Sequence, residues 1–274
     1  MPSVEAALRK ARAELDPGEA DVLLAHVCGR PRGWLYAHGD AELPPALAER
    51  FATLVERRRD GTPVAYLMGH RGFRDLDLDV TPATLIPRPE TELLVELALA
   101  RLPMEQARRV ADLGTGSGAI ALSLARARPL VSMLATDASE AALDVARANA
   151  ARLGIDNVAF ALGDWWRAVG GARFDLVASN PPYIAEGDPH LSEGDLRHEP
   201  REALVSGGDG LDAIREIAGG ATRHLLPGGW LMVEHGWEQG AAVRGLFTGA
   251  GLADVATSRD LEGRDRVTAG CLRG

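Results

Sequence analysis

Two spacings of apolar residues divide this chain. Up to about residue 70 the apolar positions recur every three or four residues, as on one face of a helix. Val4, Leu8, Ala11 and Leu15 are the first such set, and the longest stretch runs from about 45 to 59. Further short helices are expected near 17–28, 34–36 and 63–68. Residues 1–70 therefore predict a small helical bundle, and because it carries no catalytic pattern we interpret it as a docking or structural module.

From residue 71 the spacing changes. Apolar and acidic residues alternate between positions 75 and 80, which predicts a strand with one polar face. We expect Thr84–Ile86 to return as the second arm of a hairpin, so that 71–87 would link the bundle to the rest. The aspartates favour a solvated face over a cation site, since they lack the glycine turn of a calcium loop.

Beyond residue 88 strands and helices alternate, which is typical of an α/β domain with a doubly wound, mostly parallel sheet. The domain is expected to span residues 88–274. Strands are predicted at 109–113, 131–136, 157–162, 174–179, 229–234, 253–258 and 266–272. Helices are predicted from about 90 to 102 and at 117–127, 139–153, 209–226 and 238–249.

A glycine-rich loop follows the first of these strands. Its residues are Gly114, Thr115, Gly116, Ser117 and Gly118. Glycines allow a tight turn and a close approach of the backbone to a ligand at a helix N-terminus. Such a loop alone does not distinguish between classes of nucleotide-binding protein.

Polar residues at the ends of the next two strands refine this interpretation. Asp137 could accept hydrogen bonds from both hydroxyls of a ribose, and Asp164 and Trp165 stand where an adenine would lie. Each has a structural alternative, because the aspartates could cap helices and the tryptophan could be core. Their positions at consecutive strand ends favour a shared ligand.

The second chemical signal is Asn180-Pro181-Pro182-Tyr183, directly after a predicted buried strand. This pattern suits methyl transfer to a planar nitrogen, whose delocalised lone pair must be turned toward the methyl group. The side-chain oxygen of Asn180 and the backbone carbonyl of Pro181 could accept its two N–H groups, and the prolines restrain both residues. The Tyr183 ring could lie against the flat acceptor. A simple Pro-Pro turn is the alternative.

Composition excludes several classes. The 274 residues are 46% hydrophobic and carry a net charge of −9, which argues against a broad nucleic-acid surface. Cys28 and Cys271 match no disulfide or metal spacing, so a reducing compartment is expected. No apolar run has the length of a membrane span. A cytoplasmic protein with no resident metal is predicted.

Several motifs together resemble the HemK/PrmC-type release factor glutamine methyltransferases. The resemblance extends over almost the whole chain. Its most specific segments lie at 62–69, 84–92, 112–118, 179–184, 198–204 and 234–236. Arg74 departs from the family pattern, where an aromatic residue is expected after Phe73, and this concerns hairpin packing only.

The resemblance implies a seven-stranded class I methyltransferase domain that takes S-adenosylmethionine as methyl donor. The implied substrate is the glutamine of the Gly-Gly-Gln loop of class I peptide chain release factors, methylated at N5. By motif, residues 114–118 with Asp137, Trp165 and Asn180 would contact the cofactor. Asn180, Pro181, Pro182 and Tyr183 would hold the glutamine amide, and no general base is needed. A monomer is expected.

Two alternatives remain open at this stage. A DNA adenine methyltransferase shares the Asn-Pro-Pro-Tyr motif, but the acidic charge and the lack of a base-reading domain count against it. A nucleotide-sensing or scaffold protein could retain the fold without activity. The intact Asn180 and glycine loop disfavour that reading.

Overall fold

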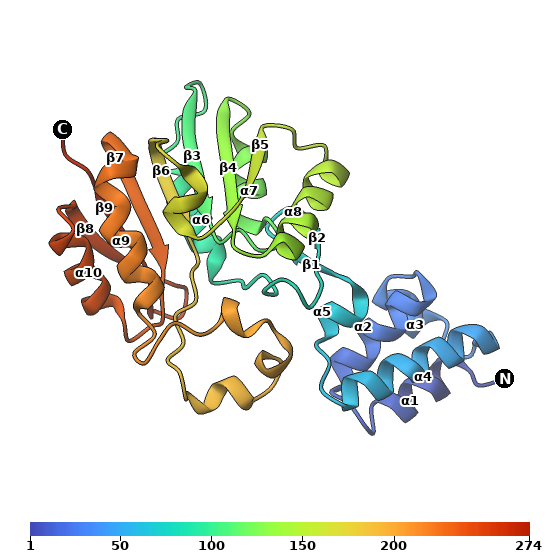
Figure 1. Ribbon diagram of the computed structural model, residues 1–274. Helices are drawn as coiled ribbons and strands as arrows, with labels where there is room; N and C mark the ends of the chain where they lie inside the picture. Colours follow the sequence, from blue (N-terminus) through green and yellow to red (C-terminus); the bar gives the residue numbers. More distant parts are fainter. The chain divides into compact units, whose positions relative to one another are not determined.

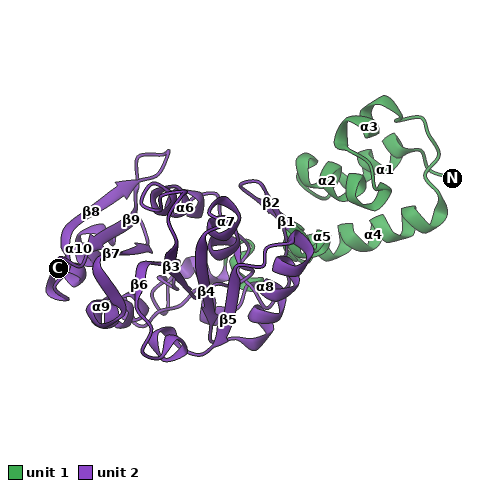
Figure 2. Cartoon of the chain, turned by 90° about the horizontal axis from the view of Figure 1, so that it is seen from above, with its two compact units in different colours: residues 1–70, 193–198 green, residues 71–192, 199–274 purple.

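The computed structural model describes all residues, 1–274, and divides them into two compact units (Figures 1 and 2). Unit 1 comprises residues 1–70 together with 193–198, and unit 2 comprises 71–192 and 199–274. The sequence does not predict that residues 193–198 pack with the helical bundle. None of the helices is both long and apolar enough to span a membrane.

Unit 1 is a bundle of short helices around one apolar core. Its helices are α1 (Val4–Ala11), α2 (Pro17–Cys28), α3 (Arg32–Ala37), α4 (Pro45–Arg59) and α5 (Val64–Met68). Of the first predicted set, Val4, Leu8 and Ala11 are buried in this core, and Leu15 is partly buried against it. Asp16 caps α2 by accepting from the Gly18 N–H at 2.8 Å, and Gly29 ends that helix in the left-handed conformation.

The added segment is held to the bundle by an arginine. Arg58 Nη1 contacts Asp195 Oδ1 at 2.8 Å, while its Nη2 contacts Glu19 Oε1 at the same distance. The guanidinium group thus joins three parts of unit 1: helices α2 and α4, and the segment from Glu193 to His198.

Unit 2 contains a seven-stranded sheet, as predicted. The strands in chain order are β3 (Arg108–Leu113), β4 (Val131–Asp137), β5 (Val158–Leu162), β6 (Phe174–Ser179), β7 (Leu225–Glu234), β8 (Ala253–Arg259) and β9 (Asp265–Cys271). Their spatial order is β5-β4-β3-β6-β7-β9-β8, and the pairings of β9 with β7 and β8 are antiparallel while the others are parallel.

Helices cover both faces of the sheet (Figure 1). They are α6 (Thr91–Leu99), α7 (Ala119–Ala127), α8 (Glu140–Leu153), α9 (Asp212–His224) and α10 (Gly240–Gly249). Short 3-10 helices are η1 (Trp165–Val169), η2 (Pro189–Ser192), η3 (Leu196–His198) and η4 (Arg201–Ala203).

The alternation of side chains along β6 shows how the two apolar layers form. Leu176 and Ala178 belong to the layer that contains α6 and α7, and Val177 belongs to the layer that contains α9 and α10. Consecutive side chains of a strand point to opposite faces, so a nearly continuous apolar run is buried on both sides.

The expected hairpin is present, but one of its predicted arms is wrong. Its strands are β1 (His70–Phe73) and β2 (Leu76–Asp79), and residues 84–86 form no strand. The Ile86 N–H instead donates to the buried Glu199 carboxylate, 2.9 Å from Oε2. Arg74 occupies the turn with φ 52°, and its N–H donates to Glu92 Oε1 at 3.1 Å.

Asn149 joins the hairpin to the glycine-rich loop. Its side chain is fully buried, accepts from the Asp79 N–H at 2.8 Å, and donates to the carbonyls of Asp79 and Ser117, both at 3.0 Å. One amide on α8 therefore satisfies three backbone groups of two other segments, where water has no access.

We expect Asn149→Ala to lower the free energy of unfolding by roughly 2–4 kcal/mol, because it leaves buried backbone groups without partners. Urea denaturation monitored by circular dichroism measures this. Arg147→Ala on the exposed side of α8 is the matched control and should leave the midpoint unchanged. Equal midpoints for the two variants would contradict this role of Asn149.

Candidate functional site

The glycine-rich loop and the Asn-Pro-Pro-Tyr segment lie beside each other because β3 and β6 are neighbours. Val110 pairs with Leu176 and Asp112 with Ala178 in parallel register. The Ser179 hydroxyl also donates to the Leu113 carbonyl at 2.6 Å, which fixes the two strand ends together. Chain segments leaving β3 and β6 therefore begin at one edge, the place where open α/β sheets bind ligands.

A cavity of about 480 Å³ opens at this edge. Its wall includes nearly every residue that the sequence analysis assigned to cofactor binding: Gly114, Thr115, Gly116, Ser117, Asp137, Asp164, Trp165 and Asn180. Gly118 lies just behind them, as the residue that precedes α7. The other lining residues are Ala119, Ile120, Gly163 and Pro182, together with members of the segments 83–91, 138–142 and 200–203.

The loop's conformation depends on its glycines. Gly114 has φ 76° and Gly116 φ 56°, in the left-handed region that side chains other than glycine rarely adopt. A β-carbon on Gly114 would also come within 3.4 Å of the Trp165 ring. The tryptophan therefore packs over the loop and forms part of the cavity wall.

Asp137 orders the loop as well as facing the cavity. Its Oδ2 accepts from the Gly116 N–H and its Oδ1 from the Ser139 N–H, both at 2.9 Å. Burial raises the pKa of this carboxyl, and these backbone N–H groups oppose the effect. Each carboxylate oxygen has a second lone pair, so hydrogen bonds to a ribose remain available.

Two of the Asn-Pro-Pro-Tyr residues line the cavity, and the other two are packed against the fold. Asn180 and Pro182 line the cavity. Pro181 is buried, and Tyr183 is packed partly against the apolar layer of α9 and α10. Gln239 Nε2 donates to the Tyr183 carbonyl at 3.0 Å. Burial raises the pKa of the Tyr183 phenol, so the hydroxyl stays protonated.

The amide of Asn180 has one protein partner. Its Nδ2 donates to Thr91 Oγ1 at 3.0 Å, and no protein group donates to its Oδ1. An acceptor oxygen at the cavity wall is what the orientation of an incoming amide requires. Thr91 itself was not expected at the site from its side-chain chemistry. The only signal was its position within the 84–92 segment of the family resemblance.

Arg88 and Glu199 form a second support that the motif analysis did not assign. Their side chains make a short ion pair, and Glu199 is buried. Together with the hydrogen bond from the Ile86 N–H, this ion pair joins the segment 84–92 to the stretch 199–203. That stretch supplies Pro200 and Glu202 to the cavity wall. One carboxylate, that of Glu199, thereby holds together two segments that line the cavity.

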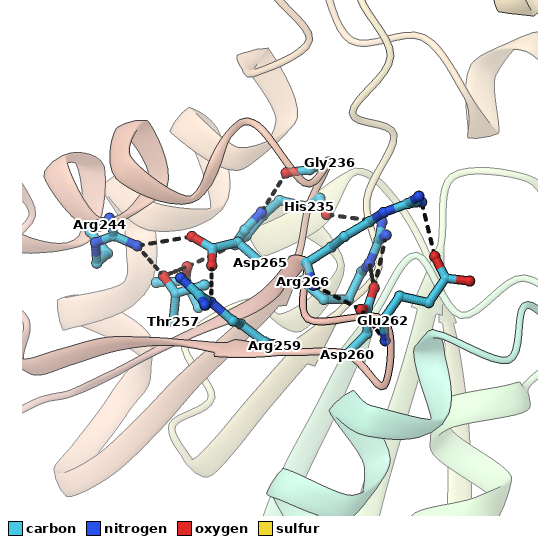
Figure 3. A network of polar contacts seen from close by, with 11 residues as sticks. His235, Gly236, Arg244, Thr257, Arg259, Asp260, Glu262, Asp265 and Arg266 are labelled. Atoms are coloured by element: carbon cyan, nitrogen blue, oxygen red, sulfur yellow. Dashed lines mark hydrogen bonds and ion pairs between the residues drawn. The ribbon is translucent and has the colours of Figure 1, made fainter.

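His235, which follows β7, makes contacts within the fold. Buried His235 lies 2.8 Å from the Thr268 hydroxyl through Nε2 and 2.9 Å from the Gly236 carbonyl through Nδ1 (Figure 3). Burial lowers its pKa. No group of three or more His, Cys, Asp or Glu side chains is placed to hold a metal ion.

Asp112 supports the loop without lining the cavity. It is fully buried, and its Oδ2 accepts from the Thr115 hydroxyl at 2.7 Å while Oδ1 has no partner. The charged lining residues Asp137, Asp164 and Glu202 outnumber Arg88, which suits a cationic ligand. The glycine cradle and the acceptors at the strand ends thus match the donor's nucleotide and charged groups.

The fold and this site define a class I methyltransferase. The first part of the chain, residues 3–69, matches the PrmC N-terminal domain, and residues 90–216 match the methyltransferase small domain. The chain belongs to the release factor glutamine methyltransferases. It is 58% identical over 274 residues to the release factor glutamine methyltransferase of Xylella fastidiosa (strain Temecula1), covering 100% of both chains. It is 48% identical over 268 residues to that of Escherichia coli K12, covering 96% of each.

Among solved structures, a Thermus thermophilus 16S rRNA N2 G1207 methyltransferase in complex with AdoMet and guanosine has the same fold. The TM-score is 0.56 at 20% sequence identity, over 74% of this chain and 50% of that one.

The buried carboxyls predict a pH dependence of stability in the ligand-free protein. Burial raises the pKa of Asp112 to about 7, so the native state keeps a proton that the unfolded chain loses near pH 4. The contribution to stability is therefore full at low pH and is lost as pH rises toward 7, by at most about 1.4 kcal/mol per pH unit.

We expect Asp112→Asn, which imitates the protonated acid, to reduce the loss of unfolding free energy between pH 5.5 and 8 by about 2 kcal/mol. Chemical denaturation at the two pH values measures it. The same decrease in wild type and variant would show that Asp112 is ionised throughout this range.

Proposed function

We propose that this protein transfers a methyl group from S-adenosylmethionine to the N5 side-chain amide of the glutamine in the Gly-Gly-Gln motif of class I peptide chain release factors. The observation that carries the proposal is the unpartnered Oδ1 of Asn180 on the wall of a cavity that also contains the glycine loop. Membership of the release factor glutamine methyltransferases supports the substrate.

The chain's own residues would position both reactants. Gly114, Gly116 and Asp137 would hold the nucleotide part of S-adenosylmethionine, with Asp164 and Trp165 at the adenine. When bound, this group supplies an electrophilic methyl on a sulfonium. Asn180 Oδ1 would accept one N–H of the glutamine amide and the Pro181 carbonyl the other, which turns the nitrogen lone pair out of the amide plane.

No base is assigned to the reaction. A methylated amide nitrogen that carries an extra proton is strongly acidic and loses that proton to water. The roles left to the protein are therefore orientation and charge complementarity. Pro182 would close one side of the site, and Tyr183, held through its carbonyl by Gln239, would keep the segment in place.

Unit 1 is proposed to capture the release factor. The bundle supplies no lining residue of the cavity and no cluster of metal-ligating side chains, so binding is the role that its composition supports. A release factor as substrate supports a cytoplasmic location, and the two free cysteines fit a reducing compartment. We propose that it acts as a monomer.

A methyl-transfer assay with tritiated S-adenosylmethionine tests the function. Intact release factor should be labelled, whereas the same factor with Gly-Gly-Gln changed to Gly-Gly-Ala and a duplex DNA rich in adenine should not. Label on the DNA alone would favour an adenine methyltransferase. No label on any acceptor, with the donor bound, would favour a sensor that retains the fold.

Asp137→Ala should weaken binding of S-adenosylmethionine by about 2–3 kcal/mol, through loss of charged hydrogen bonds to the ribose. Asp137→Asn should lose less, because one acceptor remains for the loop. Isothermal calorimetry measures both, with the exposed Asp144→Ala on α8, the helix that follows β4, as control. Unchanged affinity in Asp137→Ala would remove this residue from the ribose site.

Asn180→Ala should lower the single-turnover rate of methyl transfer by ~100–1000-fold, about 3–4 kcal/mol, by analogy with the loss of one oxyanion-hole donor. Substrate affinity should change far less. Asn180→Asp should retain partial activity, since it keeps the acceptor. A rate for Asn180→Ala within threefold of wild type would disprove orientation by this amide.

A further inference from the structure

A single cationic side chain lies among the residues that line the cavity. Arg88 is the only lysine, arginine or histidine there, beside the carboxyls of Asp137, Asp164 and Glu202. These carboxyls suit the sulfonium and the ammonium group of S-adenosylmethionine, but they repel its α-carboxylate, the one anionic group of the donor at neutral pH. Charge complementarity therefore favours Arg88 as the partner of that carboxylate.

Arg88 is placed on the side of the cavity where the methionine part of the donor is expected. The Thr91 N–H donates to the Arg88 carbonyl at 3.2 Å, and the Thr91 hydroxyl oxygen lies 3.0 Å from Asn180 Nδ2. Asp137 and Trp165, proposed at the ribose and the adenine, follow β4 and β5, on the other side of β3 from β6. The methyl to be transferred must face Asn180, so the sulfonium end of the donor belongs on the side of Arg88.

The backbone around Arg88 is restrained from both directions. Pro87 and Pro89 have fixed φ angles, and a residue that precedes a proline is confined to extended conformations. The Ile86 N–H donates to the buried Glu199 carboxylate, 2.9 Å from Oε2. A side chain on such a segment loses less conformational entropy when it binds a ligand.

The guanidinium group of Arg88 has hydrogen-bonding capacity to spare. Its Nη2 donates to Glu199 Oε1 in a short ion pair, while Nε and Nη1 have no protein acceptor. The Glu199 side chain is 0% exposed and that of Arg88 is 30% exposed. A guanidinium carries five N–H groups in a planar fork, so it can bind a second carboxylate beside the first. The charge of Glu199 also offsets that of Arg88, which limits repulsion of the sulfonium.

We infer that Arg88 binds the α-carboxylate of S-adenosylmethionine and is the residue by which the protein distinguishes this donor from analogues without that group. The inference rests on the donor named in the proposed function and is independent of the methyl acceptor. The competing place for the carboxylate is the glycine loop at the N-terminus of α7, because helix N-termini attract anions.

Isothermal calorimetry with two ligands tests the inference. S-adenosylmethionine and decarboxylated S-adenosylmethionine differ only in the α-carboxylate. We expect the wild-type protein to bind the first roughly 10–100-fold more tightly, the effect of charge-assisted hydrogen bonds to one carboxylate. Equal affinity of the wild type for the two ligands would overturn the inference.

Variants of Arg88 assign the preference to this side chain. Arg88→Met removes the charge, and Arg88→Gln removes it while keeping a donor for Glu199. Both should weaken binding of S-adenosylmethionine by roughly 10–100-fold and change the affinity for the decarboxylated ligand by less than about threefold. Arg88→Lys keeps the charge and should retain most of the preference. Arg126→Met, half-exposed on α7 and outside the cavity lining, is the control and should bind like wild type.

Two results with these variants contradict the inference. Equal weakening of both ligands would show that Arg88 only supports the cavity wall through Glu199. An unchanged preference would place the carboxylate elsewhere, as at the glycine loop. If Arg88→Met does not fold, Arg88→Gln decides between these results.

The measurement needs no methyl acceptor, so it is separate from the test of the proposed function. A wild-type protein that labels no release factor but prefers the carboxylated ligand through Arg88 would leave this inference standing. A wild-type protein that binds neither ligand would overturn both.

Discussion

The parallel pairing of β3 with β6 is the constraint on which the site depends. It is the point where the strand order turns from β5-β4-β3 to β6-β7, so the loops that leave the two strands diverge and a cavity opens between them. The bond from Ser179 to the Leu113 carbonyl fixes the strands at their carboxyl ends. Every group proposed to meet a reactant is placed relative to this pair.

Charge buried around the cavity is the second organising feature. Asp112 and Glu199 are nearly inaccessible, and each accepts from a backbone N–H of another segment, Asp112 from Ala121 and Glu199 from Ile86. Hydrophobic packing builds the sheet and its two helical layers, but it does not distinguish one loop conformation from another. The buried carboxyls select one loop conformation, because hydrogen bonds are directional and leave a buried loop few alternatives. The buried carboxyls lower the free energy of unfolding, and in return they fix the geometry of the loops at the site.

The sheet and its glycine loop were predictable because their signals are local. A buried strand is an apolar run, and Gly114 and Gly116 mark a backbone that only glycine adopts easily. The second arm of the hairpin was mispredicted because Ile86, which reads as a strand residue, gives its N–H to Glu199, 113 positions away. Thr91 was missed for the same reason. A single threonine acquires meaning only through its contact with Asn180, 89 positions away, and no periodicity reports that contact.

The path of the chain through residues 193–198 limits how the helical bundle could be exchanged between related enzymes. Because that segment packs with the bundle through Arg58, the chain passes between the units three times, after residues 70, 192 and 198. The two units are therefore not formed by two successive, uninterrupted stretches of the chain. Exchanging the bundle for that of a relative with a different surface would require the six residues around Asp195 to travel with it.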